Sequence, residues 1–231
     1  MKHQRVEADP LFAGFYSTSD AARLLGLSGT VKLRGWLNGW PGSASGPIVE
    51  RDFKSTSTVS FLDLMEMRFI EFFRGQGVTM QTLRKAAERA RNDWGSDHPF
   101  ALSKAKYLTD RRKIFAQVAE ETGDKVTWDM ASGQHEIWLT IENIIAKGVE
   151  FDPETELASR WFPRPSEFPT IAIDPKLAFG RPVVTGPGVP TAALFRQWKA
   201  EAGNSKKVAA WFNVSAADVD NAVEFELQTA A

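Results

Sequence analysis

Two short stretches near opposite ends of the chain share one pattern of residues that end and begin helices. The N-terminal stretch reads TSDAARLLGLS and the C-terminal stretch reads KKVAAWFNVSAADV. When Ser28 is aligned with Ser215, Gly26 falls on Asn213. Gly and Asn tolerate the left-handed backbone that ends a helix, and Ser is a preferred cap of the next helix. The pattern therefore predicts, at each end, two helices joined by a three-residue turn, which is the helix-turn-helix plan.

The N-terminal copy has candidate caps for both helices. Ser19 is the expected N-cap of the first helix, and Asp20 beside it suits the positive end of the helix dipole. Ser28 is the expected cap of a second helix that continues to about Leu37. The inward side of that helix would consist of Val31, Leu33, Trp36 and Leu37. Such corners also occur in proteins that bind no DNA, so DNA contact by the C-terminal copy stays open.

The chain between the two copies changes character several times. Residues 39–58 are rich in Gly, Pro and Ser and favour a hairpin wing, and Ser60 and Thr79 are expected to cap two longer helices. The elements expected further on are strands at 113–119 and 125–130, a helix at 134–147, an extended piece at 157–162 and a proline-rich linker at 163–169.

The predicted fold class is therefore α+β and mainly helical. We expect a winged helix-turn-helix domain at residues 1–98, a small mixed segment at 99–165, and a C-terminal domain with a second helix-turn-helix at 166–231.

Composition excludes several classes of protein. A hydrophobic content of 43% with 25% charged residues is typical of a folded chain. The absence of cysteine excludes disulfides, thiolate zinc sites and a thiol nucleophile, and it suits a reducing compartment. No apolar run approaches the roughly 20 residues that span a bilayer, and the start MKHQRVEADP lacks the apolar core of a signal peptide. We expect a cytoplasmic protein without a membrane partner.

Charge is distributed unevenly between the two halves. Residues 1–113 carry 18 Lys and Arg against 12 Asp and Glu, whereas residues 114–231 carry 10 against 17. A basic front half favours a polyanionic partner and an acidic rear half a different one. Chance drift of surface charge is the alternative.

Residue types that perform catalysis or bind metals do not form a recognisable set. Asp63 and Glu66 lie one helical turn apart, as many solvated pairs do, and His3, His98 and His135 have no partner at metal-ligand spacing. The stretch GPGVP lacks the Lys-Ser/Thr of a phosphate loop. We therefore expect no catalytic residue, no metal site and no cofactor.

The N-terminal stretches YSTSDAARLLGLSGTVKLRGWL and FLDLMEMRFIEFFRGQGVTMQTLRKA flank the Gly/Pro-rich wing. Together they resemble the DNA-binding domains of the MerR family, in which a helix-turn-helix, a wing and a second helix pair follow one another. The resemblance covers about residues 15–95. It ends where that family continues into long dimerising helices, and the chain has no cysteine for metal sensing.

A second motif lies in the C-terminal part: Asp-Pro at 174–175, FGRPV at 179–183, a Gly-to-Thr loop at 186–191, and then the helix pair. This order resembles a short antitoxin domain, domain of unknown function 433, over about residues 169–227. The loop GPGVP departs from the usual pattern of that domain by a proline and an extra glycine.

A chain that combines both segments resembles the larger VapB-type antitoxins. In such type II modules the antitoxin binds a PIN-like ribonuclease toxin and represses its own operon. The resemblance thus implies a PIN-like toxin and operator DNA as partners, and paired operator half-sites favour a homodimer.

Specific residues follow from this interpretation. Lys32 and Arg34 are expected to meet DNA, one of them at a base edge, and the remaining cations are phosphate candidates. Ordinary solvated surface charge is the alternative. The predicted DNA-binding residues are Arg23, Thr30, Lys32, Arg34, Arg51, Lys54 and Arg84.

The toxin or dimer surface is predicted to include Arg181, Phe225 and Leu227, whereas Trp198, Trp211 and Phe212 are expected in the core. Arg181 could also pair with Asp174. The competing function is a one-component regulator whose segment 100–165 binds a small effector. A nuclease is a third possibility, which lacks a convincing carboxylate cluster.

Overall fold

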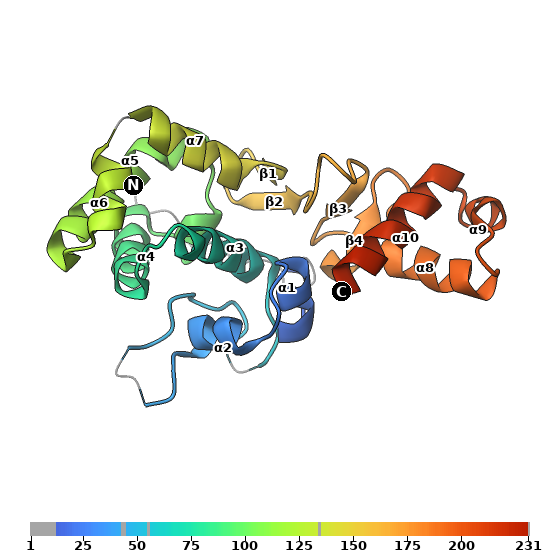
Figure 1. Cartoon of the computed structure of the whole chain (residues 1–231), viewed down its shortest axis with the longest axis horizontal. Helices are drawn as coiled ribbons and strands as arrows, with labels where there is room; N and C mark the ends of the chain where they lie inside the picture. Colours follow the sequence, from blue (N-terminus) through green and yellow to red (C-terminus); the bar gives the residue numbers. More distant parts are fainter. Residues whose placement is uncertain (1–12, 43–44, 55, 134, 231) are drawn as a thin grey trace.

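The computed structural model describes residues 13–42, 45–54, 56–133 and 135–230, and its fold is mixed α+β. Helices occupy both ends of the elongated molecule and a small sheet lies between them (Figure 1). The predicted α+β class is confirmed. In chain order the elements are α1 (Thr18–Leu24), α2 (Val31–Asn38), α3 (Phe61–Gly75), α4 (Met80–Trp94), η2 (Pro99–Ala101), α5 (Lys104–Thr122), α6 (Lys125–Ser132), α7 (His135–Ala146), β1 (Val149–Phe151), β2 (Ala158–Trp161), β3 (Ile171–Ile173), η3 (Ala178–Gly180), β4 (Pro182–Val184), β5 (Val189–Pro190), α8 (Thr191–Ala200), α9 (Ser205–Phe212) and α10 (Ala216–Ala230).

The sheet is an antiparallel meander in the order β1-β2-β3-β4-β5. Trp161 in β2 pairs with Ile173 in β3, so the sheet continues across the proline-rich segment at 163–169 that was expected to be a linker. The domain boundary predicted near residue 165 lies between these two paired strands. The division into domains stays a prediction.

The first helical corner begins two residues earlier than expected. Ser17, not Ser19, is the N-cap of α1, because its hydroxyl accepts the backbone N–H of Asp20 at 3.0 Å while the Asp20 carboxylate accepts the N–H of Ser17. Ser28 does not cap α2, whose N-cap is Thr30. The turn therefore spans residues 25–30 rather than three residues.

Helix α2 is amphipathic. Leu33, Trp36 and Leu37 are buried as predicted, whereas Val31 is 67% exposed, contrary to prediction. The segment after α2 is not a hairpin: its described residues form no strand, and the N–H groups of Ile48 and Val49 both point to the carbonyl of Trp36 at the end of α2. We keep the name wing for residues 39–58, of which the structure does not describe residues 43, 44 and 55.

Helices α3 and α4 begin where the caps predict. The Ser60 hydroxyl accepts the N–H of Asp63 at 3.0 Å, and the Thr79 hydroxyl accepts that of Thr82 at 3.1 Å. The inward face of α3 supplies aromatic rings to the main core, where Phe69 stacks on the ring of Phe100 with centroids 4.2 Å apart. Local capping and a continuous apolar face therefore specify both helices.

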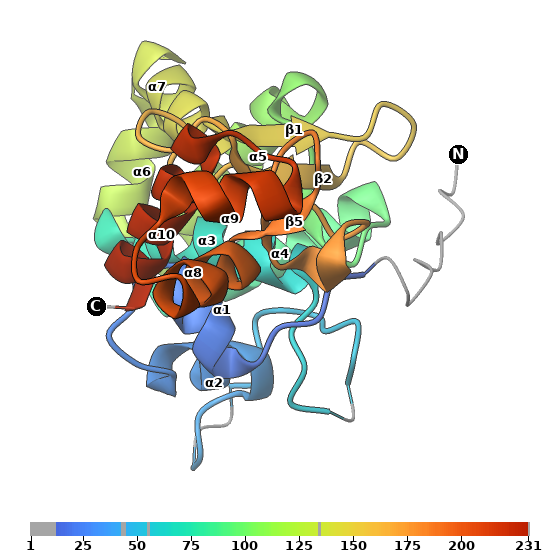
Figure 2. The same cartoon turned by 90° about the vertical axis from the view of Figure 1, so that its right-hand side faces the viewer.

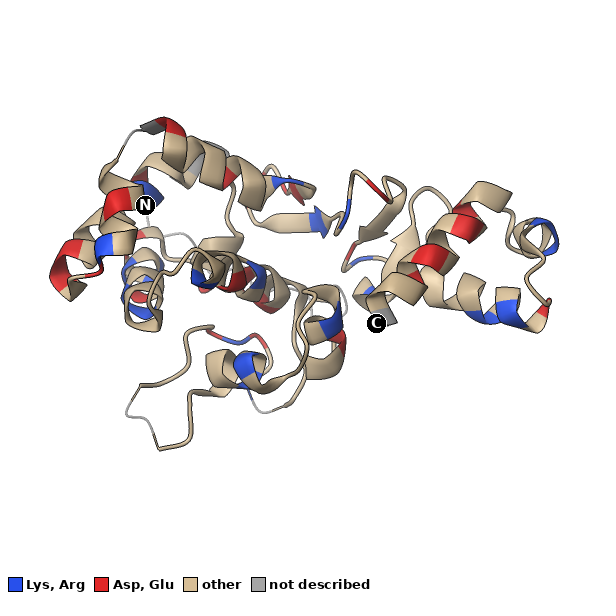
Figure 3. Ribbon diagram, viewed as in Figure 1, with Lys and Arg blue, Asp and Glu red and all other residues tan. Residues whose placement is uncertain are grey.

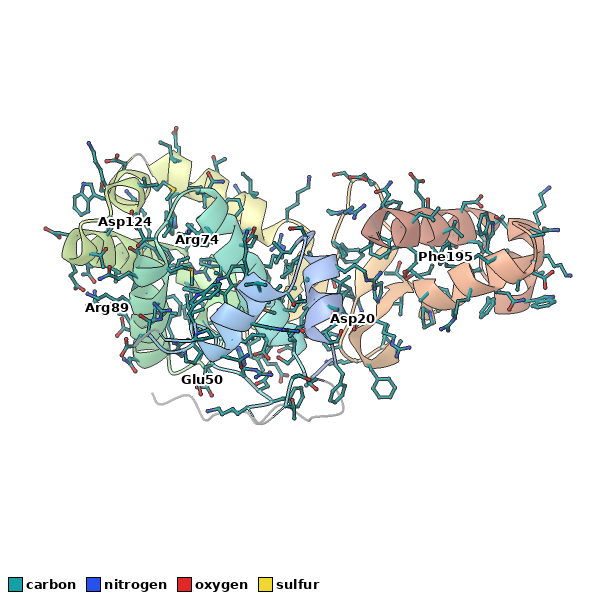
Figure 4. The ribbon with its side chains drawn as sticks, turned by 60° about the horizontal axis from the view of Figure 1, so that its bottom comes forward. Asp20, Glu50, Arg74, Arg89, Asp124 and Phe195 are labelled. Atoms are coloured by element: carbon teal, nitrogen blue, oxygen red, sulfur yellow. The ribbon has the colours of Figure 1, made fainter. Side chains whose placement is uncertain are left out.

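The strands predicted at 113–119 and 125–130 are wrong, because both segments are helical. Residues 113–119 belong to α5, where Phe115 and Val118 are buried on the side that packs against the main core. Residues 125–130 belong to α6, which begins at the N-cap Asp124. The carboxylate of Asp124 also accepts the N–H of Thr79 at 3.0 Å, so it joins α6 to the start of α4 (Figure 4). The helix predicted at 134–147 is confirmed as α7.

The C-terminal helices α8, α9 and α10 enclose a small core of their own. Thr191 is the first helical residue of α8 and is buried. Asn204 caps α9, Asn213 ends it in the left-handed region at φ 52°, and Ser215 with Asp218 forms a capping box at the start of α10. The corner between α9 and α10 thus has the predicted three-residue turn.

The C-terminal motif packs against the start of the first corner. Tyr16 donates its hydroxyl hydrogen to the carbonyl of Gly180 at 2.8 Å, and the N–H of Phe15 donates to the carbonyl of Phe179 at 3.0 Å. Gly180 has φ +81°, and a Cβ there would lie 2.3 Å from the Tyr16 hydroxyl oxygen. The glycine of FGRPV is therefore required both by its backbone and by this close approach.

Viewed from the C-terminal end, α2 and the wing project on one side of the molecule, and α1 lies between them and the helices α8 to α10, where Arg23 of α1 pairs with Glu226 of α10 (Figure 2). Among the described residues, every helix is too short or too polar to cross a membrane.

Candidate nucleic-acid interface

Helix α2 presents two cations outward. Lys32 and Arg34 are exposed on either side of the buried Leu33, because side chains at successive helical positions point in different directions. The Lys32 ammonium lies 3.2 Å from a carboxylate oxygen of Glu71, and its side chain remains 59% exposed. Exposed ion pairs of this kind contribute little to stability, so a phosphate can take the place of Glu71. Within the described chain, no group bonds the guanidinium of Arg34.

Two other predicted DNA contacts, Lys54 and Arg23, are already paired with carboxylates within the protein. Lys54 forms an ion pair with Glu50, which is labelled in Figure 4. Arg23 on α1 lies 3.2 Å from Glu226 of α10. Thr30 is half-buried at the start of α2 and makes no side-chain capping bond.

Three arginines hold the wing in place. Arg51 donates to the side-chain oxygen of Asn38 at 3.0 Å and to the carbonyls of Thr56 and Thr58 at 2.6 and 2.8 Å. From α4, Arg84 donates to the carbonyl of Gly46 at 3.2 Å, and Arg91 donates to that of Ile48 at 3.1 Å. These guanidinium groups satisfy backbone carbonyls of an irregular segment. The role of Arg91 was not predicted from the sequence.

The second corner has the opposite charge on its second helix. Helix α10 exposes Asp220 and Glu224 and carries no lysine or arginine, whereas the cations Lys206 and Lys207 lie on α9 (Figure 3). In a helix-turn-helix the second helix enters the major groove, and carboxylates there would repel the phosphates on both sides. The α9–α10 corner is therefore poorly suited to read DNA.

Behind the wing lies a cluster of titratable side chains, which we call the acid–histidine cluster: Asp52, Asp63, Glu66 and His98. The Nε2 atom of His98 lies 3.0 Å from an oxygen of Asp52 in the wing. Asp63 and Glu66, predicted to be a solvated pair on α3, are both fully buried. The prediction was wrong because the turn at residues 98–100 covers this face of α3. Glu66 accepts the N–H of Phe100 at 2.8 Å.

Burial and charge move the pKa values of this cluster in a consistent way. Burial lowers the pKa of His98, but the hydrogen bond to Asp52 and the negative charges of Asp52, Glu66 and Asp63 outweigh it and raise the pKa to about 9. Burial raises the pKa of Glu66 to about 7 and also raises that of Asp63. The charged histidine is thus the cation that balances the buried carboxylates.

The residues predicted for a partner surface are placed differently from one another. Phe225 is only 1% exposed, because its ring packs edge-on against Phe168 in the segment between β2 and β3. It therefore cannot form a surface in this conformation. Leu227 is 53% exposed and Arg181 is exposed, while Asp174 pairs with Arg160 at 2.9 Å rather than with Arg181.

Two exposed aromatic residues were not anticipated. Trp211, predicted in the core, is 59% exposed. Phe179 in the FGRPV motif is 63% exposed and has a left-handed backbone, φ 57°, which is rare for an aromatic residue. Non-glycine residues held in the left-handed region cluster at functional sites. Only the position of Phe179 in the motif could have indicated this from the sequence.

The middle segment contains a small cavity beside the buried ion pair of Arg111 and Glu142, whose charged atoms are 2.6 Å apart. The cavity measures about 20 Å³. That volume accommodates about one water molecule. This cavity is therefore too small for an organic effector, and the competing hypothesis stays a prediction.

Comparisons with known proteins inform the fold. The crystal structure of Rv2018 from Mycobacterium tuberculosis is similar to this chain with a TM-score of 0.67 at 20% sequence identity, over 94% of this chain and 98% of that one. At this identity the similarity shows a shared fold over nearly the whole length. No family model matches the sequence, and no curated protein matches it.

Proposed function

We propose that the chain is a DNA-binding autorepressor that also neutralises a protein toxin, as the antitoxin of a type II module does. The observation that carries the DNA-binding half is the outward pair Lys32 and Arg34 on α2. Buried Leu33 and Trp36 hold this helix in place, and a wing anchored by arginines lies beside it. A helix of this size fits the major groove, and two cations on it meet phosphates or a guanine edge.

The toxin-binding half rests on the resemblance of the C-terminal motif to the antitoxin domain. Two features support it. Phe179 and Arg181 are both exposed on either side of Gly180 in the motif, and α10 gives this end of the chain an acidic surface with the exposed Leu227. A PIN-like ribonuclease that binds RNA would offer cations to such a surface.

The DNA-binding half is tested with the Lys32→Ala/Arg34→Ala double variant of the full chain. Its affinity for the protein's own promoter fragment is measured by fluorescence anisotropy. The binding free energy should weaken by about 1–3 kcal/mol if one of the two side chains reads a base edge, and the salt dependence should become shallower for each phosphate that is no longer neutralised. The matched control is Arg196→Ala/Lys199→Ala, which removes two exposed cations from α8. If the control weakens binding as much as the α2 variant does, the assignment of the interface to α2 is wrong.

The toxin-binding half is tested by co-expressing the chain with the product of the adjacent gene. Both the wild-type chain and the Lys32→Ala/Arg34→Ala variant should co-purify with it at equal yield. Loss of both activities in a variant that remains folded would contradict the separation of DNA binding from toxin binding.

A further inference from the structure

The acid–histidine cluster joins three separate parts of the chain. Asp52 comes from the wing, Asp63 from α3 and His98 from the turn before η2. One potential ligand atom from each of these residues lies within 4.8 Å of the other two. The cluster is thus a meeting point that the chain builds from segments up to 46 residues apart.

Several polar atoms of this cluster lack a partner although they are buried. Within the described chain, Asp63 Oδ1, Glu66 Oε2 and His98 Nδ1 accept or donate no hydrogen bond. The three residues are at most 5% exposed. Buried polar atoms without a partner are costly, and an unplaced ion is one of their recognised causes. Here two of the three atoms are carboxylate oxygens beside an imidazole.

We propose that Asp52, Asp63 and His98, with Glu66 beside them, bind a divalent transition-metal ion such as Zn²⁺ or Mn²⁺. One imidazole and two or three carboxylates form a ligand set of the kind that such ions accept. This inference does not depend on the proposed DNA or toxin binding.

The charges and distances of the cluster fit a divalent ion. Three carboxylates lie near one permanent cation, Arg91, whose charge acts on Glu66. With a neutral histidine the local charge is therefore −2. Two ligand atoms that each lie about 2.1 Å from one ion can be at most about 4.2 Å apart. The three atoms lie within 4.8 Å of one another, so the widest pair must approach by up to about half an ångström for opposite ligands and by up to about 1.4 Å for ligands of a tetrahedral ion. Asp52, an exposed residue of the wing, can supply this movement.

A proton and the metal ion would compete for the same place. The imidazole of His98 is bonded to Asp52 through Nε2 at 3.0 Å, and a metal ion can bind only a ring nitrogen that carries no proton. An ion at this position would fix the wing to α3 and to the 98–100 turn.

The test uses the full chain, freed of metal with a chelator and titrated with Co²⁺ at pH 8. We expect one equivalent to bind with visible d–d absorption and to be displaced by Zn²⁺ and not by excess Mg²⁺. The melting temperature should rise with ion concentration, because a ligand of the native state stabilises it.

Two variants and a matched control locate the site. Asp52→Asn, in the exposed wing, and His98→Gln should each weaken Co²⁺ binding at least about tenfold. Asp129→Asn, which removes an exposed carboxylate from α6, should bind as the wild type does. The proposal is overturned if the wild-type chain shows no saturable binding of one equivalent, if Asp52→Asn keeps the wild-type affinity, or if Mg²⁺ displaces Co²⁺.

Discussion

The two helical corners of this chain differ in ways that their similar sequences conceal. Both use a Ser-x-x-Asp capping box and a left-handed residue, Gly26 at φ +68° in one and Asn213 at φ 52° in the other. In the first corner the box caps the first helix, and the turn spans residues 25–30. In the second corner the box caps the second helix after a three-residue turn. The shared capping and helix-ending residues therefore specify where helices begin and end, but they do not specify the geometry of the corner.

Charge separates the corners further. The second helix of the first corner exposes Lys32 and Arg34, and that of the second corner exposes Asp220 and Glu224. Because a major groove is bordered by phosphates, the corner that presents cations is suited to DNA. A helix-turn-helix must therefore be judged by the exposed face of its second helix.

The largest expected difference between the corners is in the contribution of their tryptophans to stability. Trp36 is 2% exposed beneath the first corner, and Trp211 is 59% exposed on the second. Trp36→Ala should lower the free energy of unfolding by about 3–5 kcal/mol, whereas Trp211→Ala should change it by less than about 0.5 kcal/mol. Urea denaturation followed by circular dichroism measures both. Comparable decreases would mean that Trp211 is buried in solution, for instance in a complex with another copy.

The acid–histidine cluster behind the wing should make the stability of the first corner depend on pH, unlike that of the second. The pKa of His98 is raised from 6.5 to about 9, so its contribution is fully present below pH 6.5 and is lost as the pH rises through 9. The pKa of Glu66, about 7, acts in the same direction over a lower range. In metal-free buffer the free energy of unfolding should therefore fall by about 3 kcal/mol between pH 6.5 and 9.5.

Asp52→Asn is the variant that checks this source. It removes the main hydrogen-bond partner of His98, so most of the alkaline decrease should disappear while Asp129→Asn retains it. A wild-type stability that is flat or rising over this range would contradict the arrangement of Asp52 and His98.

A smaller and equal effect is expected at the two capping boxes. The hydroxyls of Ser17 and Ser215 each accept an N–H three residues ahead at 3.0 Å. Ser17→Ala and Ser215→Ala should each lower the local opening free energy of their helix by about 1 kcal/mol. Hydrogen exchange of α1 and α10 amides reports on each helix separately. An effect on only one helix would show that the two boxes are not equivalent.

The smallest effect is expected from neutralising the second corner. Asp220→Asn/Glu224→Gln should change promoter affinity by less than about twofold, since charges further from DNA than about 10 Å are screened by salt. Anisotropy titrations at physiological salt suffice. A large gain in affinity would place α10 close to the duplex.

Much of the helical framework could be predicted, because its signals are local. Ser60 and Thr79 lie next to their helices, and the apolar stripes of α3 and α4 have the helical period. The prediction for the middle segment was wrong because the sequence IFAQVA, taken alone, has the pattern of a short strand. Its apolar residues lie four positions apart in α5, which becomes evident only over the full 19 residues.

The site was harder to predict because its determinants are distant in sequence. Asp63 and Glu66 look solvated until the turn at His98 covers them, and Phe225 looks exposed until Phe168 packs on it. The exposure of Lys32 and Arg34 followed from the helical period alone. No local pattern indicated that Arg51 and Arg91 would bond the backbone of the wing.

The bonds from Tyr16 to Gly180 and from Phe15 to Phe179 have a thermodynamic consequence. They connect the residues just before α1 to the motif that carries the exposed Phe179, so neither element can shift without straining the other. A ligand that shifts that motif would change the affinity of α2 for its proposed DNA partner only if the shift is passed on through Phe15 and Tyr16 to the first corner. The reciprocal influence, from α2 back to the motif, has the same magnitude.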